Sequence, residues 1–176
     1  HYVIFEHLGG SSEEQQWANY RLNEGKGIMM WGKVNNPYYQ LLMGYGSDSN
    51  FGGIGHESRG FQGKRLLGYF ESHDEERIMY KALQYGNNWD GYNIQELNIA
   101  LSRMSAIGAM SLTIPGPKMI WHFSDLGMEN SLFTCYDGSV NEPDCKLDTK
   151  PQPQWANNWL SNDNRREVYD NWSRII

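Results

Sequence analysis

A cluster of ionisable side chains directly follows one apolar run of this sequence. Residues 70–77 read Phe-Glu-Ser-His-Asp-Glu-Glu-Arg, and residues 66–69 before them read Leu-Leu-Gly-Tyr. Like charges held close together disfavour one another, so such a cluster is costly for stability alone. Open α/β sheets and α/β barrels keep their chemistry where strands end in loops. The cluster therefore predicts a functional site that includes His73 and Asp74.

Two other apolar runs end in the same way: Glu6 and His7 follow residues 2–5, and Ser124 and Asp125 follow residues 118–123. A fourth run, 28–31, is followed by Gly32, Lys33 and an asparagine pair. Four short apolar runs, each followed by a polar loop, favour parallel strands that share one functional face. We therefore expect Glu6, Asp74 and Asp125 to converge on that face.

Helices between these runs must hold the strand ends in place. Serines and acids at 11–14 predict a serine-capped helix to about residue 22, stopped by glycines at 25 and 27. Helical spacing of apolar residues is clearest over 94–112, which Pro115 and Pro117 follow. Two further helices are expected, at 38–45 and after a cap at Asp163. Alternating strands and helices predict an α/β fold with parallel pairing.

Composition narrows the class of protein. The 176 residues suit one domain, and 15 basic against 21 acidic residues give a net charge of −6, which disfavours binding to nucleic acid. No apolar stretch approaches the roughly 18 residues of a membrane span, and no glycine-rich nucleotide loop follows the first strand. The 7 Trp and 11 Tyr suit sugar stacking or a core. The aromatic residues near loops are Trp31, Tyr38, Trp89 and Tyr92.

The two cysteines, Cys135 and Cys145, lie ten residues apart in a polar segment. They are either a disulfide or two free thiols. We favour the disulfide, because the segment has little else to support it, and with it a secreted or periplasmic location. Of the charged residues after 70, Glu71, Glu75, Glu76 and Arg77 are expected to form a solvated, salt-bridged rim.

Several segments together resemble the α-amylase family, glycoside hydrolase family 13. Residues 70–74 look like its motif at barrel strand seven, an aromatic residue, two variable positions and then His-Asp. Residues 112–121 look like the stretch leading into strand eight, and 124–129, Ser-Asp-Leu-Gly-Met-Glu, are similar to the acidic Gly-Met loop after it. Residues 4–6, Ile-Phe-Glu, resemble strand five. The segments keep the family's order and spacing over essentially the whole chain.

The resemblance implies a partial TIM (β/α)8 barrel, strands five to eight with their helices, over residues 1–176. It implies a retaining glycosidase of α-linked glucans, in which one carboxyl group protonates the leaving oxygen and a second, about 5–5.5 Å away, attacks the anomeric carbon. Glu6 matches the general acid/base, Asp74 the carboxylate that holds sugar hydroxyls, and His73 the histidine that donates to the same ring. Trp31 and His7 are further candidates for substrate binding.

The family's nucleophile motif, of the type Asp-x-x-x-Arg-x-Asp, does not occur in this sequence. The sequence begins at His1 inside a strand-like run, so we expect a longer polypeptide whose preceding part supplies the nucleophile. The 176 residues alone are then expected to be inactive. An α-glucan polysaccharide or oligosaccharide is the expected partner, with no cofactor or metal in these residues and calcium possible elsewhere in the longer protein. An uncovered inner face and two open strand edges predict a homo-oligomer.

Three other functions fit parts of the sequence. The spelling Glu-Ser-His-Asp also occurs in branching enzymes, so glucan branching or another transglycosylation is an alternative to hydrolysis. A chain with aromatic sugar sites and no nucleophile would be a non-catalytic carbohydrate-binding fragment. A metal phosphohydrolase would use the His-Asp doublet with His7, His56 and His122, but no two histidines have the short spacing of zinc ligands.

Overall fold

The computed structural model describes residues 2–7, 9–148 and 155–176, which form a mixed α/β chain. A small parallel sheet has its strands in chain order: β1 (Ile4–Phe5), β2 (Met29–Lys33) and β3 (Leu66–Tyr69). Met30 of β2 lies opposite Leu66 of β3. Three of the four expected strands are confirmed, with bounds that differ by at most two residues.

The fourth expected strand, 118–123, is wrong. Lys118 pairs with Gly68 of β3 through one isolated parallel bridge, and the pairing stops there. The chain then turns at Phe123, which has a φ of 60°, into the 3-10 helix Ser124–Leu126. An apolar run becomes a strand only where a neighbouring strand pairs along it, and no described segment pairs along the outer side of this run.

The α-helices of the described residues are α1 (Ser11–Asn19), α2 (Asn35–Met43), α3 (Ile78–Tyr85), α4 (Leu97–Leu112) and α6 (Asp163–Ile175). All but α3 correspond to expected helices. The N-caps differ from expectation, because Gly10 precedes α1 without a side-chain cap, and the side chain of Asn162, not Asp163, caps α6. Glu13 and Glu14 do lie in the first turn of α1.

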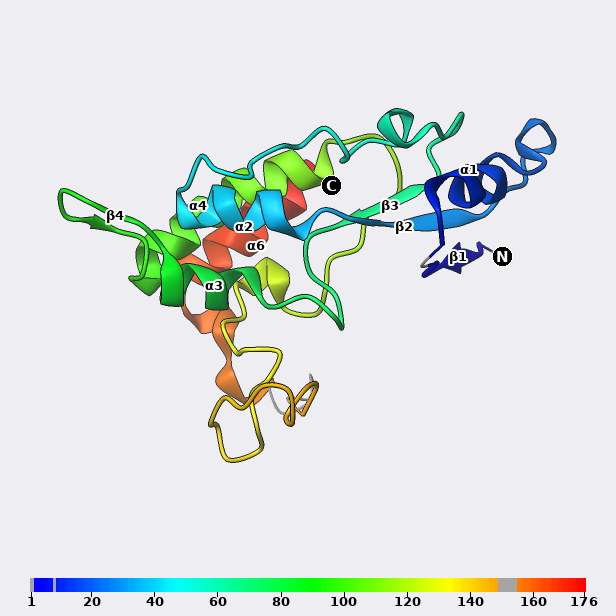
Figure 1. Ribbon diagram of the computed structural model, residues 1–176. Coiled ribbons are helices and arrows are strands. Elements are labelled where there is room, and N and C mark those ends of the chain that lie inside the picture. The colour runs from blue at the N-terminus through cyan, green and yellow to red at the C-terminus, as the bar shows by residue number, and fades with distance from the viewer. Residues whose placement is uncertain (1, 8, 149–154) are drawn as a thin grey trace.

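The main hydrophobic core lies among α2, α3, α4 and α6, which gather at one end of the molecule, while the sheet and α1 extend toward the other (Figure 1). Trp172 of α6 is buried there, and its indole N–H donates to the Met104 carbonyl at 2.9 Å. Gly108 lets the two helices approach, since a Cβ at this position would lie 2.2 Å from the Trp172 ring. This core fixes the helices that follow β2 and β3.

A hairpin, β4 (Asn88–Trp89) and β5 (Tyr92–Asn93), projects from the helical end (Figure 1). Its turn residues Asp90 and Gly91 both have positive φ, as hairpin turns of this length require. Trp89 and Tyr92 stack on each other there and are exposed, whereas Tyr38 is buried in the main core. None of the described helices is long and apolar enough to cross a membrane.

Candidate active site

Glu6, His73 and Asp74 meet at the carboxyl ends of the parallel strands. Glu6 directly follows β1, and His73 and Asp74 lie in the turn after β3. The Glu6 Oε1 lies 3.4 Å from His73 Nε2, and the Asp74 Oδ2 lies 3.5 Å from the same nitrogen. The prediction that Glu6 and Asp74 converge is confirmed, with His73 between them. All three side chains are between one third and one half exposed, so a ligand from solvent can reach them.

Aromatic rings border this group. Trp31 of the middle strand contacts the His73 ring edge-to-face, with ring centroids 5.5 Å apart, and also contacts the Tyr69 ring at 5.1 Å. The Trp121 ring also lies near His73, with ring centroids 6.4 Å apart. Trp31 thus lies at the site as expected, while sequence reasoning did not single out Trp121.

The structure does not bring His7 or Asp125 into this group. The His7 ring turns toward α1, where its Nε2 lies 3.5 Å from Glu13 and its Nδ1 accepts the Gly9 amide. Asp125 lies in the turn after 118–123 and borders a different hollow, lined by Phe123, Trp155 and other apolar residues. Burial raises the pKa of the Asp125 carboxyl. The expected convergence of three strand ends therefore holds for two of them.

The charged residues around Asp74 are not the solvated rim that their sequence suggests. Glu71, Glu75 and Arg77 are all buried, and Glu76 is half-buried. The Glu71 Oε1 accepts the Ile78 amide at the start of α3 at 2.7 Å, and its Oε2 accepts the Ser124 hydroxyl and lies 3.6 Å from Arg77. Burial raises the pKa of Glu71, and Arg77 and Ser124 oppose that rise. This buried network fixes both ends of the turn that carries His73 and Asp74.

Two further acidic residues, Glu75 and Glu76, secure the same turn. The Glu75 carboxylate accepts the Ser72 hydroxyl and lies 3.0 Å from the Lys33 ammonium. Glu76 accepts the Ser131 hydroxyl at 2.6 Å and a backbone amide of the next loop. These acidic residues therefore hold the turn in place, through neighbours such as Ser72 and through distant residues such as Lys33 and Ser131.

His122 extends this network and must stay neutral in it. Its Nε2 lies 2.8 Å from the Arg77 guanidinium, which is donor-only, so this nitrogen accepts and the proton lies on Nδ1. Burial, and then the Arg77 charge, lower the His122 pKa to about 4. His122 therefore has a structural role in holding Arg77.

We expect this neutral histidine to make folding pH-dependent. Between about pH 6.5 and 4 the unfolded chain binds a proton at His122 that the folded chain does not, so the free energy of unfolding falls as the pH is lowered through this range. The loss is about 1–2 kcal/mol after allowance for partial exposure. Urea unfolding of the wild type and of His122→Gln, whose amide oxygen can still accept from Arg77, measures it.

The difference between these two proteins should shrink from pH 7 to pH 4, because His122→Gln lacks the titrating ring. His56→Gln is the matched control, since His56 directly precedes the 3-10 helix Glu57–Arg59, outside this network. Equal loss of stability on acidification in wild type and His122→Gln would contradict the assignment.

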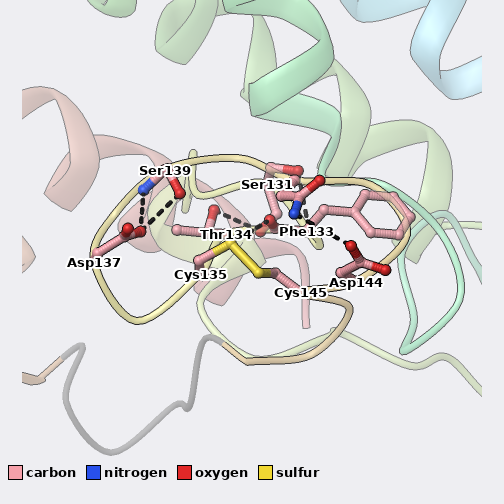
Figure 2. The surroundings of a disulfide bond; sticks show 9 residues. Ser131, Phe133, Thr134, Cys135, Asp137, Ser139, Asp144 and Cys145 are labelled. Atoms are coloured by element: carbon pink, nitrogen blue, oxygen red, sulfur yellow. Dashed lines mark hydrogen bonds between the residues drawn. A yellow bond between two sulfur atoms is a disulfide. The ribbon is translucent and has the colours of Figure 1, made fainter.

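A lysine from a distant loop also contacts the site. The Lys146 ammonium forms an ion pair with the Asp74 Oδ1, and this hydrogen bond is the main cause of a lowered Asp74 pKa. Lys146 directly follows Cys145, which is bonded to Cys135, so the expected disulfide is confirmed (Figure 2). No motif of the sequence marked Lys146, because it lies 72 residues from Asp74.

The donor set can serve proton transfer, hydrogen bonding or cation binding. Glu6, His73 and Asp74 each offer one ligand atom, all within 4.8 Å of one another. A cation at this position would share Asp74 with the Lys146 ammonium. His7, His56 and His122, which a metal phosphohydrolase would use, are not members of this group among the described residues.

Space for a larger ligand lies beside Asp74. A polar hollow of about 330 Å³ is bordered by Asp74, Glu75, Tyr80 and Phe133, which is in the size range of small-molecule sites. A scan of the chain against protein-family models found no matching family, and a search of curated proteins found no matching protein.

Proposed function

We propose that this chain is the C-terminal half of an α-amylase-type (β/α)8 barrel and that Glu6, His73 and Asp74 form its site for α-linked glucans. The convergence of Glu6 and Asp74 on His73, at the carboxyl ends of β1 and β3, carries this proposal. The order of the strands supports it, since β1, β2 and β3 are neighbours in chain order and Lys118 pairs beside β3.

The proposed reaction gives each residue one role. Glu6 donates a proton to the glycosidic oxygen as the C–O bond breaks, and afterwards removes a proton from the incoming water. Asp74, which the Lys146 ammonium keeps ionised, accepts hydrogen bonds from hydroxyls of the reacting sugar. His73 donates to the same ring. The nucleophile that attacks the anomeric carbon belongs to a part of the polypeptide outside residues 1–176.

The aromatic rings supply binding energy for the sugar. Trp31 and Trp121 both contact His73 and are partly exposed, so their apolar faces border the position where the reacting ring would lie. The hollow beside Asp74 offers room for further sugar units. Transfer to a sugar hydroxyl instead of water would use the same residues, because Glu6 can activate either acceptor.

We also propose that the isolated chain associates with itself. Among the described residues, β1 is an edge strand that pairs only with β2, and Val3 before it and Ile4 within it are 46% and 44% exposed. Open edges with apolar side chains invite pairing with another chain. In the longer protein the other half of the barrel would cover this edge.

The 176-residue chain alone is expected to release no reducing sugar from soluble starch, because a covalent intermediate cannot form without a nucleophile. The longer polypeptide is expected to release it. A colorimetric reducing-sugar assay on both proteins tests the proposal, with the Glu6→Gln variant of the isolated chain as the control for contamination. Hydrolysis by the isolated chain that Glu6→Gln abolishes would contradict the proposal, as would a longer polypeptide that acts on no α-glucan.

A further inference from the structure

We propose that Lys146 is a positioning residue for Asp74 and that the disulfide-closed loop 131–148 holds it there. The role of Asp74 in binding sugar rests on the proposed function, but the contact between Lys146 and Asp74 does not depend on it. Lys146 Nζ contacts one carboxylate oxygen of Asp74, and His73 lies 3.5 Å from the other. With a partner on each oxygen, the carboxylate is held in one orientation and still has lone pairs for sugar hydroxyls.

The loop 131–148 runs out and back. We call residues 131–135 its first leg and residues 145–148 its second leg, and both contact the short segment 74–76. On the first leg, the Ser131 hydroxyl and the Leu132 amide donate to Glu76 at 2.6 and 2.7 Å. On the second leg, Lys146 contacts Asp74. Both legs therefore contact the segment that carries the proposed catalytic carboxylate.

Cross-links between the legs fix the backbone on each side of Lys146. Cys145 is joined to Cys135 of the first leg, as Figure 2 shows, with their Cα atoms 5.0 Å apart. The Leu147 amide donates to the Leu132 carbonyl at 2.9 Å. Lys146 thus lies between two residues that are each bonded to the first leg. The backbone at Lys146 is therefore constrained on both sides, which limits the positions that its ammonium group can reach.

The loop is needed because the ion pair is weak by itself. The side chains of Lys146 and Asp74 are 41% and 47% exposed, and exposed ion pairs contribute little against the entropy of a free lysine side chain. A lysine on an unconstrained loop would leave Asp74 much of the time. Opening the disulfide should therefore act on Asp74 in the same direction as removing the lysine.

The test follows the titration of the Asp74 carboxyl carbon by NMR in the 176-residue chain. We expect the pKa to rise toward its ordinary value in Lys146→Ala and in the double variant Cys135→Ser/Cys145→Ser, and to stay near that of wild type in Lys146→Arg. Lys26→Ala is the matched control, because Lys26 is also exposed and ion-paired, with Glu24. An unchanged titration in Lys146→Ala would overturn the proposal.

A titration that moves in Lys146→Ala but not in the double variant would overturn the role of the disulfide. If the double variant does not fold, Ser131→Ala replaces it, because this change loosens the first leg at Glu76.

A second readout separates this inference from the proposed function. Maltohexaose should bind Lys146→Ala about two- to fivefold more weakly than wild type, the range of one exposed ion pair. If no protein in the series binds it, the proposed function fails, while the titration still decides the role of Lys146. If all bind it equally, Lys146 does not position Asp74 for the sugar, and the inference fails.

Discussion

Replacing Glu6 by Gln in the longer polypeptide is expected to lower kcat on starch by about 10²- to 10⁴-fold, the usual contribution of a positioned general acid. Gln keeps the size and much of the polarity of Glu6 but cannot donate the proton that the leaving oxygen needs. KM should change much less, because the lost interaction belongs to the transition state. Initial rates on soluble starch over a range of concentrations measure both constants.

A substrate with an acidic leaving group makes this prediction specific. A dinitrophenyl maltoside leaves without a proton, so cleavage of its bond should be much less sensitive to Glu6→Gln than cleavage of starch. Asp74→Asn should lose activity on both substrates, since its role is to hold the sugar ring. Glu13→Gln, an exposed glutamate on α1, is the control. Full activity in Glu6→Gln, or equal losses in Glu6→Gln and Glu13→Gln, would remove Glu6 from the catalytic residues.

Replacing Glu71 by Ala is expected to destabilise the chain by about 3–5 kcal/mol, because it leaves the buried Arg77 guanidinium without its carboxylate. The change also removes the acceptor of the Ile78 amide and the Ser124 hydroxyl. Urea unfolding followed by circular dichroism gives the free energy of unfolding. A loss of this size is a large fraction of the roughly 5–15 kcal/mol that stabilises a typical domain.

Two variants separate the buried charge from other effects of this change. Glu167→Ala removes an exposed glutamate of α6 and should alter stability by less than about 0.5 kcal/mol. Adding Arg77→Met to Glu71→Ala removes the unpaired charge and should recover part of the loss. If Glu71→Ala is no more harmful than Glu167→Ala, the network after β3 does not support the site.

Helical spacing of apolar residues predicted helices whose pattern continues over several turns. Helix α4 matches the expected 94–112 to within three residues at its start, because its apolar residues recur over four turns. Helix α3 was not predicted, although it directly follows the charged residues 70–77. The apolar residues Ile78, Met79 and Ala82 at helical spacing were the available signal, and all three are buried.

Contacts between distant residues account for the other differences. The apolar residues 119–123 look like a strand, but strand pairing depends on a neighbour that local sequence does not reveal. Glu71 and Glu76 look like surface acids, yet their partners Ser124 and Ser131 lie 53 and 55 residues away. The contact between Lys146 and Asp74 also joins residues that lie far apart in sequence. The proximity of Glu6 to Asp74 could be predicted because the carboxyl ends of parallel strands lie at one edge of a sheet. No comparable rule predicts where a lysine of a long loop will lie.

The most direct test of the glucan site is a titration of the 176-residue chain with maltohexaose, followed by NMR of the His73 ring and the Trp31 indole N–H. We predict that both signals shift with maltohexaose and not with cellohexaose, its β-linked counterpart, and that Trp89 of the remote hairpin does not shift with either sugar. Equal shifts with both sugars, or no shift of His73 and Trp31 with maltohexaose, would contradict the assignment of this site to α-linked glucans.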